Sequence, residues 1–475
     1  MRIFLAAVFV LAGVGASADS IPLTAVNKAS AVIDRAVEAY GGAEVLEGIT
    51  TAVQQGTFTN FATYQSRRPG PPWDKSTVQR LNVVDFAQMA AYTSNQGEGG
   101  GFVTDGATLL TADGNYNINR RQNTLTPIPQ ADFNATVGPF VRITPVLLVR
   151  NLMQRRHTSH WLGETEVDGA KADIVTLVME VGPALSLYID QQSGLLSKAE
   201  RVFPPFGRVE YRYLDYKEVD GIPLHQRFEL FANGEPNMTA ELGPLKLNQP
   251  VDQYFSLPAD MLLREAVPPD PLSASKLAEG VYLVGGSGTY ALFVESEGEV
   301  IAIGGTAGIA QRIRELRNQG VDGPVRYGVL THHHNDHLLG VAAYADEGAE
   351  MVGHQSHEAV IRGTVEREIM LTTVADRHSL GSGANRVELY DIGPTPHVEH
   401  VLVAYLPQHK MLFQADHSGI GRTGPVGKGQ PVTVALHAAV KRLGLEVNRY
   451  VSAHSPRVLT QAELDEAVWR ATEAD

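Results

Sequence analysis

One seven-residue segment, residues 331–337 with the sequence THHHNDH, constrains the fold of this chain more than any other feature. It contains four of the 16 histidines and directly follows an apolar, strand-like stretch at residues 325–330. A buried imidazole needs hydrogen-bond partners, so four of them this close together would be costly without a cation to share their lone pairs. The segment therefore predicts a metal site on a loop after a buried strand, and a solvated polar loop is the alternative.

The length and composition of the chain indicate a globular protein with more than one domain. Its 475 residues are too many for one ordinary hydrophobic core, so two or three domains are expected. The formal net charge of −14 argues against binding to a phosphate backbone, and nucleic acid is therefore not expected as a partner. The absence of cysteine excludes disulfide bonds, a thiolate nucleophile, iron–sulfur clusters and cysteine-ligated zinc.

Residues 1–18 have the pattern of a secretory signal peptide. Met1-Arg2 gives a basic start, residues 3–14 form an apolar run too short to span a bilayer, and Ala16-Ser17-Ala18 is a small-residue cleavage site. We therefore expect a secreted or periplasmic protein whose mature chain begins near Asp19, with an uncleaved anchor as the alternative. No later segment is apolar and long enough to span a membrane, so stable membrane insertion is not expected.

Residues 19–266 are expected to form a β-rich domain with a leading helix. Apolar residues recur with the helical period in residues 24–40, and Gly41-Gly42 supplies a stop signal. Residues 51–257 instead show strand patterns, with polar and apolar residues alternating as in residues 208–213. The alternation predicts an antiparallel sheet with one solvated face.

The order of these N-terminal elements resembles a known fold. The leading helix, the Tyr40-Gly41-Gly42 turn and the long meander of strands are similar to the outer-membrane lipoprotein-sorting fold, an open half-barrel that cradles acyl chains. The resemblance implies that residues 19–266 form a half-barrel-like domain that holds acyl chains or presents an acylated substrate.

A proline-rich linker at residues 267–274 is expected to precede a second domain at residues 275–475. In this second half, strand-like stretches such as residues 280–293 and 299–303 alternate with helical ones. The whole chain is therefore expected to be an α+β multidomain protein whose C-terminal half is α/β. Helices are expected at residues 309–318, 338–346 and 432–443, the last closed by Gly444.

The histidine-rich segment matches the signature of a known family. Its spacing, His332-x-His334-x-Asp336-His337, is that of the His-x-His-x-Asp-His signature of the metallo-β-lactamase superfamily. Further ligand residues follow in the order of this family, so the C-terminal domain resembles the metallo-β-lactamase fold, an αββα sandwich. These residues are His397 on a loop at residues 391–397, Asp416 after a hairpin at residues 401–415, and His454 after a strand ending at Val451.

The resemblance implies two metal sites that share one carboxylate. Neutral imidazoles and carboxylates suit zinc, iron and manganese, so the implied cofactors are two divalent ions, zinc first among them. The resemblance assigns His332, His334 and His397 to the first site, Asp336, His337 and His454 to the second, and Asp416 to the bridge between them.

The resemblance implies an exported binuclear metal-dependent hydrolase. A hydroxide bridging the two ions would attack an ester, thioester, lactone or phosphoester bond of a small-molecule substrate, hydrophobic or acylated substrates included. Asp336 is expected to orient this nucleophile or to accept its proton. The alternatives are β-lactam hydrolysis, persulfide oxygenation at a single iron, and lipid or acyl binding by a protein whose metal domain is structural.

Other residues near these ligands are weaker candidates for metal ligation. His400 would replace His397 if the loop were threaded differently, whereas His333 and Asn335 occupy variable positions of the signature. His417 is expected to point away from the metal site, because its neighbour on the strand points into it.

The sequence departs from the family at an early strand. Residues 301–306 read IAIGGT, whereas the family carries an aspartate there, in a Leu-Ile-Asp-Thr-Gly type sequence, that orients ligands through hydrogen bonds. Without that carboxylate, the groups that hold the ligands in place are expected to differ from those of the family.

Overall fold

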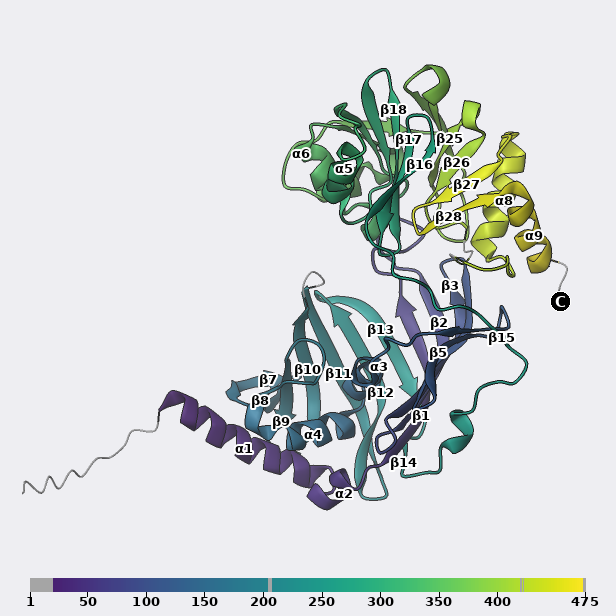
Figure 1. The fold of residues 1–475 in the computed structure, drawn as a ribbon. Coiled ribbons are helices and arrows are strands. Elements are labelled where there is room, and N and C mark those ends of the chain that lie inside the picture. Colours follow the sequence, from purple (N-terminus) through teal and green to yellow (C-terminus); the bar gives the residue numbers. More distant parts are fainter. Residues whose placement is uncertain (1–19, 204–206, 419–420, 422, 473–475) are drawn as a thin grey trace, which may run out of the picture.

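The structure, a computed structural model of the chain, describes residues 20–203, 207–418, 421 and 423–472. The expected signal peptide, residues 1–18, lies outside the described residues. Figure 1 shows two lobes, a curved N-terminal sheet with helices along it and a C-terminal lobe with helices on its outside. Within the described ranges, no helix is long and apolar enough to cross a membrane.

The N-terminal lobe is one 15-stranded sheet, as the alternating sequence pattern predicts. The strands are mostly half-buried; β1, for example, buries residues 52, 54, 56 and 58 along one face. The strands are β1 (Thr51–Phe61), β2 (Lys75–Asp85), β3 (Ala90–Gly99), β4 (Phe102–Thr111), β5 (Gly114–Asn119), β6 (Thr124–Pro127), β7 (Trp161–Val167), β8 (Ala170–Leu177), β9 (Leu185–Asp190), β10 (Leu196–Phe203), β11 (Gly207–Val219), β12 (Ile222–Ala232), β13 (Glu235–Leu242), β14 (Lys246–Leu247) and β15 (Leu262–Leu263).

The strand order brings distant parts of the chain together in the middle of the sheet. The order is β15-β6-β5-β4-β3-β2-β1-β13-β12-β11-β10-β9-β8-β7, with β14 paired to β1. β1 forms a hairpin with β2 on one side and pairs with β13 on the other, where Gly56 lies opposite Leu242. The lobe is therefore two antiparallel meanders joined by one long-range pair of strands.

Helices pack against this sheet and complete its core. Ser20 caps the first helix by accepting a hydrogen bond from the Leu23 N–H, and the leading helix is confirmed. Ile33, Leu147 and Phe228 are fully buried in one apolar cluster of helix and strand residues. The helices are α1 (Ile21–Ala39), α2 (Ala43–Glu47), α3 (Phe133–Arg142) and α4 (Pro145–Gln154).

The expectation of strands throughout residues 51–257 is wrong for α3 and α4. Pro139 interrupts the helical signal of α3. In α4, residues 145–149 are all buried, so the polar positions that reveal a helical period are missing from its first turns. An apolar run of this kind reads equally well as a buried strand.

The C-terminal lobe consists of two sheets packed face to face, with Leu292, Phe413 and Val451 fully buried between them. The strands of the first sheet are β16 (Ser273–Ala278), β17 (Val281–Gly286), β18 (Thr289–Ser296), β19 (Glu299–Ile303), β20 (Val325–Val329), β21 (Glu350–His354) and β22 (Leu371–Val374). Those of the second are β23 (Arg377–Leu380), β24 (Val387–Asp391), β25 (Leu402–Leu406), β26 (Met411–Gln414), β27 (Arg449–Ser452) and β28 (Ser455–Thr460).

Helices cover the outer sides of these two sheets. Ile313, Val341 and Ile361 anchor three helices on the first sheet, and Leu436 and Leu464 anchor two on the second. The expected αββα sandwich is therefore confirmed. The helices are α5 (Ile309–Arg317), α6 (Val341–Asp346), α7 (Glu358–Gly363), α8 (Pro431–Leu443) and α9 (Gln461–Thr472).

Most elements expected in the C-terminal half are present, with one difference. Gly444 ends α8 with a left-handed backbone, φ 64°, as a glycine after a helix should. Residues 280–293 form parts of two antiparallel strands, β17 and β18, instead of one. The turn between them has positive φ at Ser287 and Gly288, so the chain reverses inside an otherwise uniform apolar run.

The two lobes meet through backbone and amide contacts. The Val103 N–H donates to Gln430 Oε1 over 2.9 Å. The side-chain amide of Gln122 pairs with the backbone of Lys428, donating to its carbonyl and accepting from its N–H, both over 2.8 Å. Figure 1 shows β3 and the neighbouring strands reaching up to the C-terminal lobe. The domain boundaries at residues 266 and 275 stay a prediction.

Candidate metal centre

The expected ligands lie on loops at strand ends. The segment at residues 331–337 follows β20, and its last three residues form the short 3-10 helix Asn335–His337. His397 lies on the loop after β24, Asp416 follows β26, and His454 lies between β27 and β28. Because each loop follows a strand of a rigid sandwich, residues far apart in the sequence converge at one end of the two sheets.

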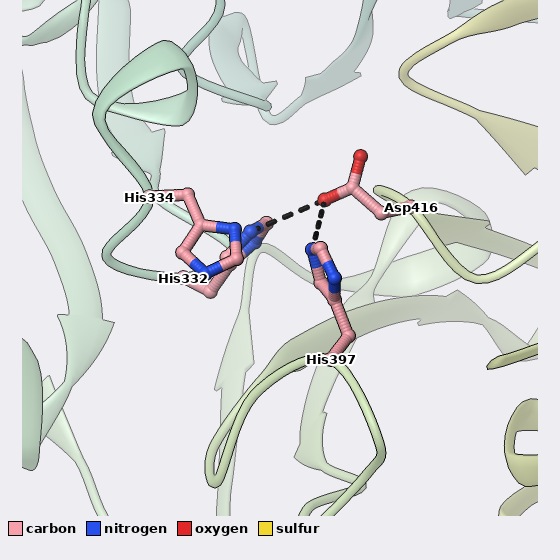
Figure 2. A group of neighbouring side chains, drawn as sticks. All are labelled: His332, His334, His397 and Asp416. Atoms are coloured by element: carbon pink, nitrogen blue, oxygen red, sulfur yellow. Dashed lines mark ion pairs between the residues drawn. The ribbon is translucent and has the colours of Figure 1, made fainter. Parts of the chain in front are cut away.

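Asp416 lies at the centre of the first group. Its Oδ2 lies 3.1 Å from His332 Nε2 and 3.3 Å from His397 Nε2. Figure 2 shows these two imidazoles pointing at the carboxylate, with His334 beside them. His334 completes a group of four with these residues, and one ligand atom of each residue lies within 4.8 Å of the other three. The structure thus brings together the three histidines expected for the first site and the expected bridging carboxylate.

Asp336, His337 and His454 form a second group beside the first. His337 Nε2 lies 3.3 Å from Asp336 Oδ2 and 3.2 Å from His454 Nε2. Asp416 reaches this group too, because its Oδ1 lies 2.8 Å from His454 Nε2 and its Oδ2 lies 3.1 Å from His337 Nε2. All seven expected ligands are therefore side by side, with Asp416 between the two groups.

The surroundings of His332, His334 and Asp416 keep these three side chains in the protonation state that a metal requires. Burial, and then the neighbouring histidines, lower the pKa of His332 well below its ordinary value and that of His334 to about 2. Burial raises the pKa of Asp416, but the surrounding imidazoles, His337 first, outweigh it and hold this pKa well below its ordinary value. At neutral pH His332 and His334 therefore offer neutral imidazoles beside the ionised carboxylate of Asp416.

In the second group, the pKa of His454 is shifted in the opposite direction to those of His332 and His334. Burial lowers the pKa of His454, but its hydrogen bond and charge interaction with Asp416 outweigh burial and raise this pKa above its ordinary value. Without a cation, the Asp416 carboxylate therefore favours the protonated form of His454.

Several polar atoms in the centre are buried without a hydrogen-bond partner of good geometry. They include the nitrogens of three histidines and an oxygen of Asp416, all facing one another. Leaving such atoms unpaired costs about 1–3 kcal/mol each, so the donor set fits divalent cations, which would use these lone pairs. The atoms are His332 Nε2, His334 Nδ1, His397 Nε2 and Asp416 Oδ2.

The opposite ring nitrogens of two of these histidines are held by carbonyl groups of the N-terminal lobe. His334 Nε2 lies 3.0 Å from the Ser66 carbonyl oxygen, and His397 Nδ1 lies 2.8 Å from that of Gly100. When these nitrogens donate, His334 Nδ1 and His397 Nε2 keep their lone pairs free. Neither Ser66 nor Gly100 was predicted as a functional residue, and the only sequence signal for them is the crowding of glycines at residues 97–101.

The side-chain amide of Gln65 is a third contact from the N-terminal lobe. Its Nε2 donates to Asp336 Oδ1 over 2.7 Å and to Asn335 Oδ1 over 2.5 Å. Gln65 was not predicted either, because a lone glutamine in a loop carries no motif.

His400 is directed away from the metal centre. Its Nδ1 lies 2.7 Å from Asp391 Oδ2, and its ring stacks on His354 with centroids 4.0 Å apart. His354 and Asp391 make up a third cluster with His400. However, His354 Nδ1 accepts from the Ser356 N–H, so its proton sits on Nε2, the nitrogen facing the cluster. A metal is therefore disfavoured there, and His397 is the better candidate in the main centre.

The remaining histidines near the centre line its periphery. His333 Nε2 lies 2.9 Å from the Ser66 carbonyl oxygen, and His333 Nδ1 lies 3.2 Å from His357 Nε2. His417 turns to Thr395, with 3.0 Å between Nε2 and Oγ1. Burial lowers the pKa of His417 to about 3, so this residue is neutral.

The glycines of residues 301–306 leave no room for the family's early aspartate. Gly304 has φ +105°, a conformation that L side chains rarely adopt. A Cβ at Gly305 would lie 2.0 Å from the His337 carbonyl oxygen. The turn therefore lies directly against the backbone of the His337 segment, where a longer side chain would not fit.

A cavity of about 810 Å³ opens onto the two ligand groups. Its floor includes Asp336, His397 and Asp416, and its walls come from both lobes. The wall residues from the N-terminal lobe are mainly amides and hydroxyls: Gln65, Asn117, Asn119, Gln122, Thr124 and Thr126, together with Phe102, Arg264 and Glu265.

Residues 284–454 match the family model of the metallo-beta-lactamase superfamily. The C-terminal lobe therefore matches this superfamily over these residues and has its fold. A search of curated proteins gave no match.

Several solved structures resemble the same part of the chain. DIM-1 metallo-beta-lactamase is 18% identical, with 43% of this chain and 100% of that one covered and a TM-score of 0.35. A metallo-beta-lactamase from Pontibacter korlensis is 19% identical, with 43% and 100% covered and a TM-score of 0.35. FIM-1 from Pseudomonas aeruginosa, in a mono-zinc form, is 19% identical, with 44% and 98% covered and a TM-score of 0.34.

Proposed function

We propose that the chain is a binuclear metal-dependent hydrolase. The family match supports a metal-dependent hydrolase in general. One observation carries the binuclear proposal: the Asp416 carboxylate contacts both ligand groups, with Oδ2 3.1 Å from His332 Nε2 and Oδ1 2.8 Å from His454 Nε2. A carboxylate placed in this way suits a pair of divalent ions held close together.

Two divalent ions at this centre would supply a nucleophilic hydroxide at neutral pH and polarise the scissile carbonyl or phosphoryl oxygen. The imidazole-rich donor set favours zinc, with iron and manganese as alternatives. We assign His332, His334 and His397 to one ion, Asp336, His337 and His454 to the other, and Asp416 to both.

Asp336 is the residue proposed to handle the proton of the nucleophile. Its side chain lines the cavity and is 46% exposed, the most open carboxylate of the centre. Gln65 fixes its Oδ1, which leaves Oδ2 facing the second ligand group. Asp336 can therefore orient an attacking water and accept its proton within hydrogen-bond reach.

The proposed substrate is a small molecule with an ester, thioester, lactone or phosphoester bond. The cavity volume of about 810 Å³ is typical of small-molecule sites. The amides and hydroxyls of Asn117, Asn119 and Thr124 favour polar groups around the scissile bond, so acylated substrates rank lower. β-Lactam hydrolysis, persulfide oxygenation at one iron and acyl binding remain the competing functions, and export rests on the pattern of residues 1–18.

Elemental analysis of the purified chain, combined with a panel of nitrocefin, lactones, thioesters and phosphodiesters, tests this proposal. We expect two divalent ions per chain and a turnover that chelation abolishes and added Zn²⁺ restores. One iron per chain would instead support the oxygenase, and a metal-loaded chain that is inactive on the whole panel would contradict the hydrolase.

A further inference from the structure

We propose that the N-terminal sheet is part of the metal centre: Gln65 and the carbonyl groups of Ser66 and Gly100 position three of its ligands. Metal binding and the contact between the two lobes are therefore coupled. This inference rests on the metal centre proposed above, but it concerns residues outside the region that matches the family model.

The Ser66 carbonyl is held rigidly in the loop between β1 and β2. Ser66 is buried, and its hydroxyl donates to the Ala62 carbonyl over 2.9 Å and accepts from the Asp74 N–H over 2.7 Å. Asp74 in turn accepts from the Arg67 N–H over 2.7 Å. These bonds close the base of the loop, so the carbonyl oxygen is fixed where His334 Nε2 meets it.

The Gly100 carbonyl is fixed by the tip of the β3–β4 hairpin. Gly101 has φ +83°, and a Cβ there would lie 2.4 Å from Val432 Cγ1, so the tip packs directly onto the C-terminal lobe. The Val432 N–H donates to the Gly101 carbonyl over 3.3 Å. Phe102 meets the His397 ring edge-on, with centroids 5.7 Å apart. The hairpin tip therefore sets both the tautomer and the tilt of His397.

Gln65 holds Asp336 in the second ligand group. One amide nitrogen bonds Asp336 Oδ1 and Asn335 Oδ1, so it also fixes the start of the short 3-10 helix that carries His337. The Asn335 N–H donates to the Tyr64 carbonyl over 3.3 Å, a second tie between the same loop and the same helix. Rotation of Asp336 away from the centre is restricted by these contacts.

Contacts of this kind, behind the ligands themselves, usually change metal affinity by about 10- to 100-fold when they are lost. In this chain they come from another lobe. A change that stabilises the contact between the lobes must then increase the metal affinity. By the same coupling free energy, bound metal must stabilise the contact between the lobes.

The test compares Gln65→Met with Gln88→Met in the full-length chain. Gln65→Met keeps the length of the side chain and removes its hydrogen bonds, whereas Gln88 is exposed at a turn of the same sheet. Zn²⁺ affinity is measured by competition with a chromophoric chelator, and coordination is read from the ligand-field absorption of the Co²⁺ form.

We expect Gln65→Met to bind one of two ions about 10- to 100-fold more weakly and to change the Co²⁺ spectrum. Gln88→Met should match the unmutated chain in affinity, spectrum and metal-free stability. Two ions bound by Gln65→Met with unchanged affinity and spectrum would overturn the role of Gln65.

Hydrogen exchange of the unmutated chain tests the coupling of the lobes. Zn²⁺ should slow amide exchange in residues 62–74 and 99–102, and equal exchange with and without Zn²⁺ would overturn the coupling. A chain that binds no divalent ion contradicts both this inference and the proposed hydrolase. A chain that shows the Gln65 effect but hydrolyses nothing on the panel contradicts the hydrolase alone.

Discussion

Asp416 is the residue on which the two ligand groups depend most. Both of its oxygens face imidazoles, and its Oδ2 is buried without a hydrogen-bond partner of good geometry. Removing its charge would leave the four surrounding histidines without a common anion. The centre should therefore be more sensitive to this side chain than to any single histidine.

We expect Asp416→Asn to lower the bound metal from two ions to one or fewer per chain. It should lower kcat/KM by about 1000-fold or more, about 4 kcal/mol of transition-state stabilisation. Metal content is read by elemental analysis and activity on the best substrate of the panel. The matched control is His400→Gln, a histidine of the neighbouring cluster, which should keep both ions. If His400→Gln lost metal while Asp416→Asn kept both ions, Asp416 would not be the shared ligand and His400 would belong to the centre.

At the residue scale the sequence is informative about side chains and silent about backbone partners. The spacing of His332, His334, Asp336 and His337 matches a ligand signature, and the structure places them together with the distant Asp416. Whether His397 or His400 joins them depends on the path of one loop, which the sequence leaves open. Carbonyl acceptors have no residue signature, because every residue carries one.

Among the elements, α4 contributes most to the core of the N-terminal lobe. We expect Leu148→Ala to lower the free energy of unfolding by about 3 kcal/mol, because Leu148 is fully buried and its truncation leaves a cavity. Urea denaturation followed by circular dichroism measures the change. Leu162→Ala is the control: this side chain is 56% exposed, and its truncation should change the free energy of unfolding by less than about 0.5 kcal/mol.

The strand β12 carries a histidine that should make the lobe sensitive to acid. His225 is 3% exposed and packs against Tyr213 and Tyr216, and burial lowers its pKa from 6.5 to about 4. The unfolded chain takes up the proton first, so stability is lost as the pH falls from 6.5 toward 4.

We expect His225→Phe to reduce the loss of stability between pH 7 and pH 4.5 by about 2 kcal/mol, since that is the part of the linkage free energy of the displaced pKa that falls between these two pH values. Urea midpoints of both proteins at the two pH values measure it, and the difference between the two losses separates His225 from other acid-sensitive groups. Equal losses in the two proteins would show that His225 does not set this sensitivity.

Elements were predicted well where polar and apolar residues alternate regularly and poorly where burial is complete. α5 and α8 show a helical stripe and match the expectation within a residue or two. The first turns of α4 and the strand β17 are almost entirely apolar, so their period cannot be read. The pairing of β1 with β13 has no local signal at all.

The candidate metal centre lies where the two lobes meet. Bound metal should therefore stabilise both lobes, as well as the loops that hold the ions. Removal of the ions with EDTA should lower the unfolding temperature measured by calorimetry, and Zn²⁺ should restore it. The expected stabilisation is about 4 kcal/mol when free Zn²⁺ exceeds its dissociation constant 1000-fold. A calorimetric profile that is identical with EDTA and with Zn²⁺ would contradict a metal site shared by the two lobes.

The long-range pairing in the middle of the N-terminal sheet sets an order of events during synthesis. β1 cannot pair with β13 until residue 242 has left the ribosome, so the two meanders of the N-terminal sheet are joined only then. The first histidine of the metal centre is made 90 residues later. A growing chain therefore joins its N-terminal sheet before it contains any of the expected ligands, and the ions should be the last component to join the folded protein.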